Sequence, residues 1–325
     1  MAQALKRIAV MTSGGDAPGM NAAIRAVVRT GIYHGLEVYG IHQAYRGLVN
    51  GDLVRMDSRD VGGIIQRGGT ILQTARLPEF KNVAVQRKAV RVLSEKGIEA
   101  VVIVGGDGSM CGGLALQKHG IRVMGIPGSI DNDIWGTDSC IGVDTATNTI
   151  LNAIDNLRDT ASSHQRVFIV EVMGRHCGHL AMVAGLVSGA EMVLIPEKTV
   201  SLEQLGQEIQ QAYLKGKAHG MIIVAEGANL KSNQIAEYLG QHDSGFEVRT
   251  TILGHVQRGG APTAFDRLLA TRFGVAAVNE LLEGHSGVMV VLRGTSIDTY
   301  PLEEIVGKQR PINPQFAQMA QILTR

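Results

Sequence analysis

Short apolar runs that alternate with amphipathic stretches constrain the fold of this chain more than any other feature. The run VVIV at 101–104 is typical, because it ends at two glycines, an aspartate, a glycine and a serine. Continuous apolar strands between helices indicate parallel sheets that are covered on both faces, an α/β fold. Strands are predicted at 7–11, 37–41, 100–104, 122–126, 166–172, 192–196, 221–226, 248–253 and 288–292, and helices at 21–35, 83–97 and 202–216.

Length and composition narrow the class of protein. A chain of 325 residues exceeds one ordinary core, so we expect two domains. Lys and Arg total 31 against 30 for Asp and Glu, which argues against a nucleic-acid or polybasic membrane-binding role. Cys111, Cys140 and Cys177 are too widely spaced for a disulfide framework. The chain shows no signal peptide and no long apolar run, so we expect a cytoplasmic protein.

The first candidate site follows the first predicted strand. In parallel sheets, ligands bind beyond the carboxyl ends of the strands. The segment TSGGDAPGMN contains Gly14 and Gly15, which allow close backbone approach before a helix that starts near Asn21. Backbone N–H groups at such a turn attract a phosphate, although a simple tight turn is an equal alternative. The segment matches neither GxGxxG nor the P-loop.

The segment GGDGS at 105–109 is the second candidate. Its three glycines clear space, and Ser109 is predicted to cap the next helix. Asp107 repels a phosphate unless a cation lies between them, and Mg²⁺ is the usual cation. The alternative role for Asp107 is a plain helix cap.

The segment PGSIDND at 127–133 is the third candidate. Asp131 and Asp133 are two residues apart, so in an extended loop they point the same way. One carboxylate could act as a base toward a hydroxyl, and the other could serve the metal. An Asx-rich turn is the alternative.

Later strand ends carry side chains that suit an anion or a sugar: Arg175, Glu226, His255 and Arg258. His176, Cys177 and His179 lack the spacing of a zinc site. Glycine turns with Asp on one part of the chain, and Arg and His on another, indicate two phosphorylated partners with Mg²⁺ between them. That layout favours phosphoryl transfer.

The chain resembles the bacterial ATP-dependent 6-phosphofructokinases in TSGGDAPGMNAAIR, RGGTILQTAR, GGDGS, PGSIDND, MGRHCG and GHVQRGG. The resemblance implies ATP-dependent phosphorylation of the 1-hydroxyl of fructose 6-phosphate to fructose 1,6-bisphosphate, the committed step of glycolysis, with Mg²⁺ as cofactor. It also implies two Rossmann-like three-layer α/β/α domains with mainly parallel sheets. The ATP-binding domain would be 1–142 plus about 258–308, and the fructose-6-phosphate domain about 143–257 plus 309–325.

The resemblance also assigns roles to single residues. Asp131 would be the general base, Arg175 and Ser129 would stabilise the transferring phosphoryl group, and Asp107 and Asp133 would serve Mg²⁺. ATP would be bound by Gly15, Arg76, Leu77, Gly106, Asp107, Gly108 and Ser109, with Tyr45 and Lys81 near the nucleotide. The sugar phosphate would be bound by Ser129, Ile130, Asp131, Arg166, Met173, Gly174, Arg175, Glu226, Arg249, His255 and Arg258.

A homotetramer is implied, in which Arg166 and Arg249 reach the neighbouring subunit's sugar-phosphate site. An effector pocket for ADP or phosphoenolpyruvate would comprise Arg25, Arg29, Arg158, Gly189, Glu191, Lys215 and Lys217. From the residues alone, Arg25 and Arg29 form a solvated pair on a helix. The chain has Gly63 where an acidic residue is common and Lys215 where Arg is common, so we expect a modest effector response. The chain also departs from the family pattern at three other positions. It has Ser129 where Thr is usual, His179 where Asp is common and Trp135 where Pro is common.

A pyrophosphate-dependent phosphofructokinase is the main alternative. Those enzymes resemble GGDDS and PKTIDND, where this chain has Gly108 and Gly128, and we expect both glycines to leave open space for ATP. A regulatory nucleotide-binding module is disfavoured because the acidic and basic residues of the site are all present. An NAD kinase is disfavoured because that resemblance stops at GGDGS.

Overall fold

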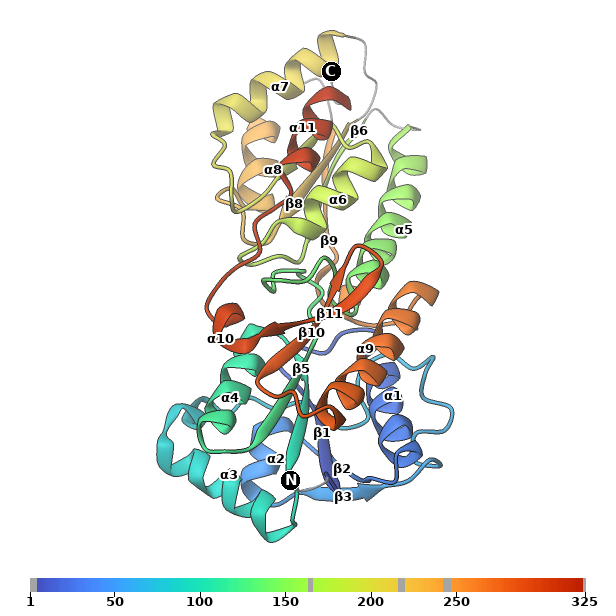
Figure 1. Cartoon of the computed structure of the whole chain (residues 1–325). Coiled ribbons are helices and arrows are strands. Elements are labelled where there is room, and N and C mark those ends of the chain that lie inside the picture. The colour runs from blue at the N-terminus through green and yellow to red at the C-terminus, as the bar shows by residue number, and fades with distance from the viewer. Residues whose placement is uncertain (1–4, 163–165, 216–219, 242–246, 324–325) are drawn as a thin grey trace. The chain divides into compact units, whose positions relative to one another are not determined.

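The computed structural model describes residues 5–162, 166–215, 220–241 and 247–323, and the chain forms two compact units that exchange segments (Figure 1). Unit 1 comprises Met1–Ile130, Ile134–Thr145 and Arg258–Arg310. Unit 2 comprises Asp131–Asp133, Ala146–Gln257 and Pro311–Arg325. The ligand that each unit binds stays a prediction.

The sheet of unit 1 has seven strands in the order β11-β10-β5-β4-β1-β2-β3. The inner strands run parallel, and β11 and β3 pair antiparallel at the two edges. The central strand β4 is buried at every residue, as expected where helices cover both faces. The strands are β1 Arg7–Ser13, β2 Glu37–Ile41, β3 Leu53–Met56, β4 Ala100–Gly105, β5 Arg122–Pro127, β10 Val288–Arg293 and β11 Ser296–Pro301.

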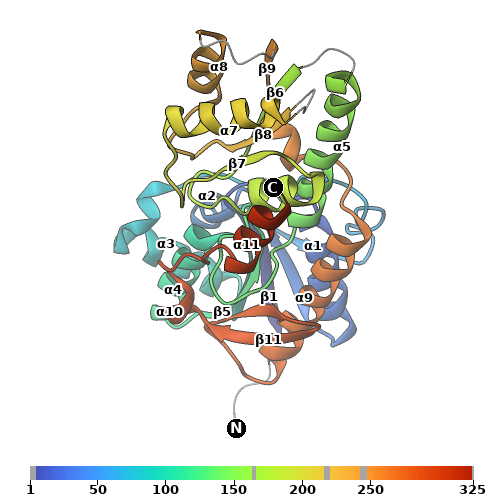
Figure 2. The same ribbon diagram turned by 90° about the horizontal axis from the view of Figure 1, so that it is seen from above.

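Helices cover both faces of this sheet (Figure 2). On one face α1 packs against α9, and on the other α2, α3, α4 and α10 share an apolar core with the strands. The helices are α1 Met20–Tyr33, α2 Ala44–Asn50, α3 Val83–Glu95, α4 Asp107–Lys118, α9 Ala264–Leu282 and α10 Leu302–Ile305, with the 3₁₀ helix η1 at Pro78–Lys81.

Unit 2 has a four-stranded parallel sheet in the order β7-β8-β6-β9. Its core joins α7 and α8 to one face, while α6 packs on β7 and β8 and against α11. The strands are β6 Arg166–Val172, β7 Met192–Leu194, β8 Gly220–Ala225 and β9 Glu247–Ile252. The helices are α5 Val143–Ser162, α6 His179–Ser188, α7 Leu202–Leu214, α8 Ser232–Gln241 and α11 Pro314–Leu323, with η2 Gly254–Arg258 where the chain returns to unit 1. The predicted fold class, two α/β/α units with mainly parallel sheets, is confirmed.

The strands β3 and β11 and the helix α2 are among the elements that the sequence analysis does not predict. The two strands lie at sheet edges and are partly exposed, so they lack the continuous apolar run of the inner strands. In the described part of the chain, every helix is too short or too polar to cross a bilayer.

Candidate active site

Three glycine-rich turns meet at one edge of the sheet in unit 1. Ser13, at the end of β1, pairs with Gly105 at the end of β4, and Gly105 pairs with Pro127 at the end of β5. The turns that follow these strands are therefore neighbours. We call residues 14–15, 106–109 and 128–129 the glycine edge.

Close packing explains why position 105 has no side chain. An added Cβ at Gly105 would lie 2.5 Å from both the carbonyl oxygen of Ser13 and the Oγ of Ser109. The prediction that Ser109 caps the next helix is wrong, because α4 begins after Gly106 and Ser109 is buried in its first turn. Gly106 has no side chain to occupy the helix N-terminus, and this geometry suits a phosphate.

Asp107 is the first residue of α4, and its side chain does not cap the helix. Its Oδ1 accepts a hydrogen bond from the N–H of Gly307 at 3.1 Å. One turn later lies the exposed thiol of Cys111. Burial and the charge of Asp107 raise the pKa of this thiol, whereas Lys81 and Lys118 lower it. Asp107 thus offers a carboxylate within the glycine edge, at the start of α4.

The two glycines that were predicted to leave space for ATP differ. Gly108 is exposed, and an added Cβ would meet no described atom within 4 Å beyond its own helix and chain neighbours. Gly128 is buried, and an added Cβ would lie 3.2 Å from Cε of Met20. The prediction for Gly128 is wrong, because its missing side chain serves core packing. Ser129, half-buried, and Ile130, buried, follow it.

The guanidinium of Arg258 lies over Gly15. An added Cβ at Gly15 would come 2.9 Å from Nη1 of Arg258, and both residues belong to unit 1. The structure therefore brings together a predicted sugar-phosphate residue and a predicted ATP residue. A guanidinium beside a glycine turn supplies the positive charge that an incoming phosphate needs.

Tyr45 supports the glycine edge from the core. Its hydroxyl donates to the carbonyl oxygen of Ser109 at 2.5 Å, and its ring packs on Phe80 with centroids 4.3 Å apart. Burial raises the pKa of Tyr45 well above its ordinary value, so the hydroxyl stays a neutral donor. Arg76 and Leu77 precede η1, and the side chain of Arg76 is exposed.

A second set of strand ends meets in unit 2. Val172 at the end of β6 pairs with Ala225 at the end of β8, and β9 ends alongside them. The residues that follow these strands form what we call the side-chain edge: Met173, Gly174, Arg175, Glu226 and His255. Arg175 and His255 are exposed, and Glu226 is half-buried.

Gln257, which sequence reasoning did not single out, braces the side-chain edge. It is fully buried, its Oε1 accepts from the N–H of Met173 at 3.2 Å, and its Nε2 donates to the carbonyl of Gly254 at 3.0 Å. It thereby ties the loop after β6 to the loop after β9. The only signal in the sequence is its place between His255 and Arg258, which η2 turns inward.

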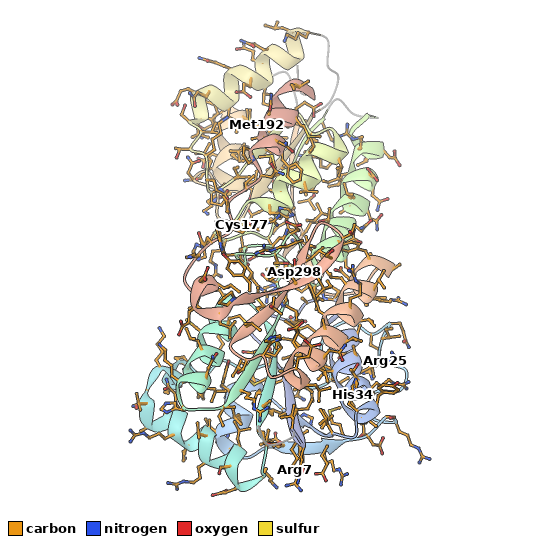
Figure 3. The ribbon with its side chains drawn as sticks, viewed as in Figure 1. Arg7, Arg25, His34, Cys177, Met192 and Asp298 are labelled. Carbon is orange, nitrogen blue, oxygen red and sulfur yellow. The ribbon has the colours of Figure 1, made fainter. Side chains whose placement is uncertain are left out.

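Residues 131–133 form a turn of unit 2 rather than the predicted extended loop. Asn132 has φ 52°, in the left-handed region, so the reason for expecting both carboxylates to point the same way is wrong. Nδ2 of Asn132 lies 3.2 Å from Nε2 of His179. Burial raises the pKa of the Cys177 thiol (Figure 3) to about 11, and the charges of Asp133 and Asp131 add to the rise. The turn therefore lies close to the segment between β6 and α6.

Arg166 lies at the opposite end of its strand from the side-chain edge. Because β6 runs from Arg166 to Val172 at about 3.3 Å per residue, Arg166 lies roughly 20 Å from that edge. Its Nε is 2.6 Å from Oε2 of Glu247, and Arg249 pairs with the same carboxylate. Within one chain, Arg166 is too far away to bind a ligand at the side-chain edge.

Three of the predicted effector residues lie near the end of α6 and the start of β8 in unit 2. Arg158 donates from Nη2 to the carbonyl of Ser188 at 2.6 Å, one residue before Gly189, which has φ 67°. Glu191 accepts from the N–H of Met221 at 2.6 Å.

The other predicted effector residues are spread over both units. Arg25 is half-buried and Arg29 is exposed on α1 in unit 1, and Gly63 is exposed in the same unit. Lys215 directly follows α7 in unit 2, and Lys217 lies outside the described residues.

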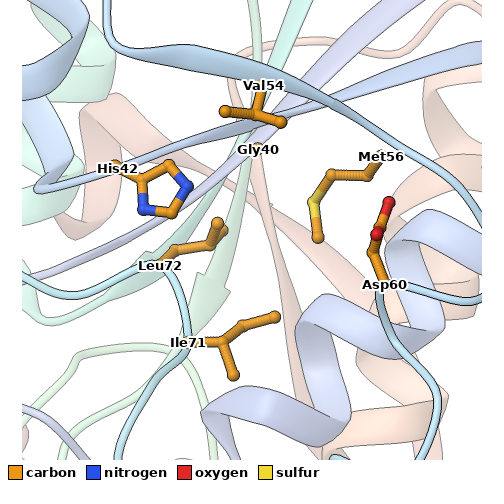
Figure 4. Close-up of a pocket in the computed structure, with 7 residues that line it drawn as sticks. All are labelled: Gly40, His42, Val54, Met56, Asp60, Ile71 and Leu72. Carbon is orange, nitrogen blue, oxygen red and sulfur yellow. The ribbon is translucent and has the colours of Figure 1, made fainter.

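Unit 1 also contains a cavity of about 210 Å³ beside β2 and β3 (Figure 4). It is lined by Gly40, His42, Val54, Met56, Asp60, Ile71 and Leu72. None of the predicted site residues lines this cavity.

Both units gather polar groups at the carboxyl ends of parallel strands. Unit 1 offers glycine turns and a carboxylate, and unit 2 offers cationic and polar side chains. These features define an α/β enzyme that binds phosphorylated ligands. The family profile described as Phosphofructokinase matches residues 7–281, and the chain belongs to this family.

Relatives and solved structures agree with this assignment. The chain is 51% identical to an ATP-dependent 6-phosphofructokinase of Thermotoga neapolitana and 49% identical to one of Shouchella clausii, over 98% of this chain and 100% of each relative. It is 38% identical to phosphofructokinase from Pichia pastoris, with TM-score 0.89, over 99% of this chain and 37% of that longer chain. A pyrophosphate-dependent phosphofructokinase from Marinobacter aquaeolei shares the fold with TM-score 0.86 at 21% identity, over 98% of this chain and 92% of that one.

Proposed function

We infer that the chain transfers a phosphoryl group from ATP to the 1-hydroxyl of fructose 6-phosphate, giving fructose 1,6-bisphosphate and ADP, the committed step of glycolysis. The observation that carries this inference is the identity of 51% and 49% to ATP-dependent 6-phosphofructokinases over their whole length. The open space at Gly108 supports ATP as the donor. Pyrophosphate is the weaker candidate, because its enzymes match at 21% identity.

In the proposed mechanism the protein positions the substrates and stabilises charge. Asp131 accepts the proton of the 1-hydroxyl, and Arg175 and Ser129 stabilise the transferring phosphoryl group. ATP is held by Gly15 and residues 106–109 of the glycine edge, together with Arg76 and Leu77. Loss of the hydroxyl proton strengthens the nucleophile as the phosphoryl group arrives.

A divalent metal ion, proposed to be Mg²⁺, completes the charge balance. Asp107 and Asp133 would serve it, and the half-exposed carboxylate of Asp107 beside the open space at Gly108 fits a cation that prefers oxygen ligands. When bound, the ion neutralises phosphate charge during transfer.

The sugar phosphate is proposed to bind at the side-chain edge together with Arg258. Arg166 and Arg249 would come from a neighbouring subunit in a homotetramer. The roughly 20 Å between Arg166 and its own side-chain edge supports this sharing. We further propose a cytoplasmic enzyme with a modest response to ADP or phosphoenolpyruvate at Arg25, Arg29, Arg158, Gly189, Glu191, Lys215 and Lys217.

A donor assay tests the function. Purified enzyme is given fructose 6-phosphate with either ATP and Mg²⁺ or pyrophosphate and Mg²⁺, and fructose 1,6-bisphosphate is measured by coupled enzymes. We expect turnover with ATP and little with pyrophosphate. Preference for pyrophosphate, or phosphorylation of NAD⁺ in place of the sugar phosphate, would overturn the proposal.

Subunit mixing tests the shared site. Arg249→Ala and Asp131→Asn would each inactivate a homotetramer. In mixed tetramers some sites receive an intact arginine and an intact base, so part of the activity should return. Absence of recovery in tetramers shown to be mixed would place both residues in the site of a single subunit.

A further inference from the structure

Asn132 holds an uncommon backbone conformation between the two carboxylates that the proposed function uses. Its φ is 52° and its side chain is only 2% exposed. Asn adopts the left-handed region more readily than most residues other than glycine, and this conformation sets the directions of its two neighbours. Contacts that hold Asn132 therefore also help to fix the directions of Asp131 and Asp133.

His179 supplies one such contact. Its Nε2 lies 3.2 Å from Nδ2 of Asn132, and its ring packs 6.3 Å from the ring of Phe316 on α11. His179 is the first residue of α6. A neutral imidazole either accepts from the amide N–H at Nε2 or, with the amide turned over, donates from Nε2 to the amide oxygen. In both cases the two side chains share a hydrogen bond, which helps to hold Asn132 in place.

We propose that His179 is a positioning residue, which acts through Asn132 to hold the turn that aims Asp131 and Asp133. The inference rests on the proposed function. The segment that ends at His179 also carries Arg175, so the same hydrogen bond ties the proposed base to the loop with the proposed phosphoryl-binding arginine. The proposed mechanism gives His179 no direct contact with the reacting atoms.

A pair of variants separates the hydrogen bond from the bulk of the ring. His179→Phe keeps a ring beside Phe316 without a polar atom, and His179→Gln restores an oxygen that can accept from Asn132. We expect His179→Phe to lower kcat about 10- to 100-fold with an unchanged KM for ATP, because small misplacements of catalytic groups are costly. His179→Gln should recover most of the turnover.

The matched control is His119→Phe. Nε2 of His119 pairs with Oε1 of Gln86 at 3.0 Å, so it is another histidine paired with an amide, at the far end of α4. This variant should keep the wild-type kcat. A loss as large as that of His179→Phe would mean that losing any such pair slows turnover, and the positioning role would fail.

A double-mutant cycle tests whether His179 acts through Asn132. Asn132→Gly keeps a left-handed backbone and removes the amide, so it should lose as much turnover as His179→Phe. The double variant should be no slower than the slower single variant. Wild-type kcat in either single variant, equal losses in His179→Phe and His179→Gln, or additive losses in the double variant would overturn the role. If His179→Phe does not fold, the kcat of Asn132→Gly alone tests the positioning role.

Failure of the proposed function gives a different pattern. A wild-type enzyme that does not phosphorylate fructose 6-phosphate, or an Asp131→Asn variant with wild-type turnover, would remove the function itself. A wild-type enzyme that needs Asp131 but tolerates His179→Phe would remove only the positioning role.

Discussion

The glycine edge of unit 1 and the side-chain edge of unit 2 lie at equivalent places in their sheets but are built differently. At the glycine edge the backbone is accessible because Gly14, Gly15, Gly106 and Gly108 have no side chains. At the side-chain edge the groups are exposed side chains such as Arg175 and His255, braced from below by buried Gln257. Backbone N–H groups suit any phosphate, whereas placed side chains can select a particular molecule. We therefore expect substitutions at the first edge to alter donor binding and those at the second to alter the sugar and the chemistry.

The largest effect is expected for Asp131→Asn, which keeps the shape of the side chain and removes its basicity. Loss of a positioned base typically costs about 10²–10⁴-fold in rate. The kcat should fall by that factor while ATP still binds, as measured by steady-state kinetics and by calorimetric titration with ATP. If both kcat and ATP affinity fall together, the proposal that Asp131 acts as a base without taking part in donor binding is wrong.

Gly108→Asp should mainly affect the donor. The carboxylate would enter the open space beside Asp107 and repel the phosphates, and about 4 kcal/mol of repulsion between close charges corresponds to a loss of at least roughly 100-fold in kcat/KM for ATP. Gly108→Ala is the control, because an added Cβ meets no described atom within 4 Å beyond its own helix and chain neighbours, and it should lose little. Normal ATP affinity in Gly108→Asp would show that the donor does not use this space. Both variants are compared after confirming that they fold.

Gln257→Ala should act on the sugar alone. It leaves the N–H of Met173 and the carbonyl of Gly254 without their buried partner, and such a loss costs about 1–3 kcal/mol. We expect the KM for fructose 6-phosphate to rise roughly tenfold and the KM for ATP to stay unchanged. A matched change in both KM values would mean that Gln257 supports the whole enzyme rather than one edge.

The smallest effect concerns two thiols that report local charge. Burial, with a smaller contribution from nearby carboxylates, raises the pKa of Cys177 to about 11. Burial also raises the pKa of Cys111, but Lys81 and Lys118 partly offset that rise. Because the pKa of Cys177 is raised above its ordinary 9.0, its stabilising contribution is complete below about pH 9 and is lost as pH rises toward 11.

Chemical denaturation can measure this loss. Between pH 7.5 and pH 10 the free energy of unfolding of the wild type should fall by about 1 kcal/mol more than that of Cys177→Ala. Cys111→Ala serves as the control and should stay closer to the wild type than Cys177→Ala does, because lysines partly offset the rise in the pKa of Cys111. Equal pH dependence in wild type and Cys177→Ala would contradict the burial of this thiol beside carboxylates.

The sequence predicts the glycine edge better than the side-chain edge for a physical reason. Glycines before helices at the ends of apolar strands are local signals, and the parallel register then brings them together. The packing around them is not local. Ser109 proved to be buried under Gly105 instead of capping the helix, and Gly128 faces Met20 from a distant helix.

The side-chain edge depends on partners that no local pattern indicates. Asn132 contacts His179 only once the fold has formed, and Gln257 is buried although its neighbours in the sequence are not.

Trp135, whose role the sequence leaves open, lies under the ammonium group of Lys308, with the nitrogen 6.0 Å from the ring centroid. The short edge strands β3 and β11 escape prediction because half-exposed strands carry too few apolar residues.

Each unit is built from separate stretches of the chain, so parts of one sheet are synthesised at different times. The chain leaves unit 1 at Thr145 and returns at Arg258, so β5 is translated long before its sheet partner β10. At about 5–20 residues per second, the ribosome needs roughly 10–30 s between these strands. During that interval the nascent β5 has an unpaired apolar edge, which is a template for pairing with other chains. The newly made protein therefore depends on rapid completion, or on a chaperone that shields this edge, until β10 emerges.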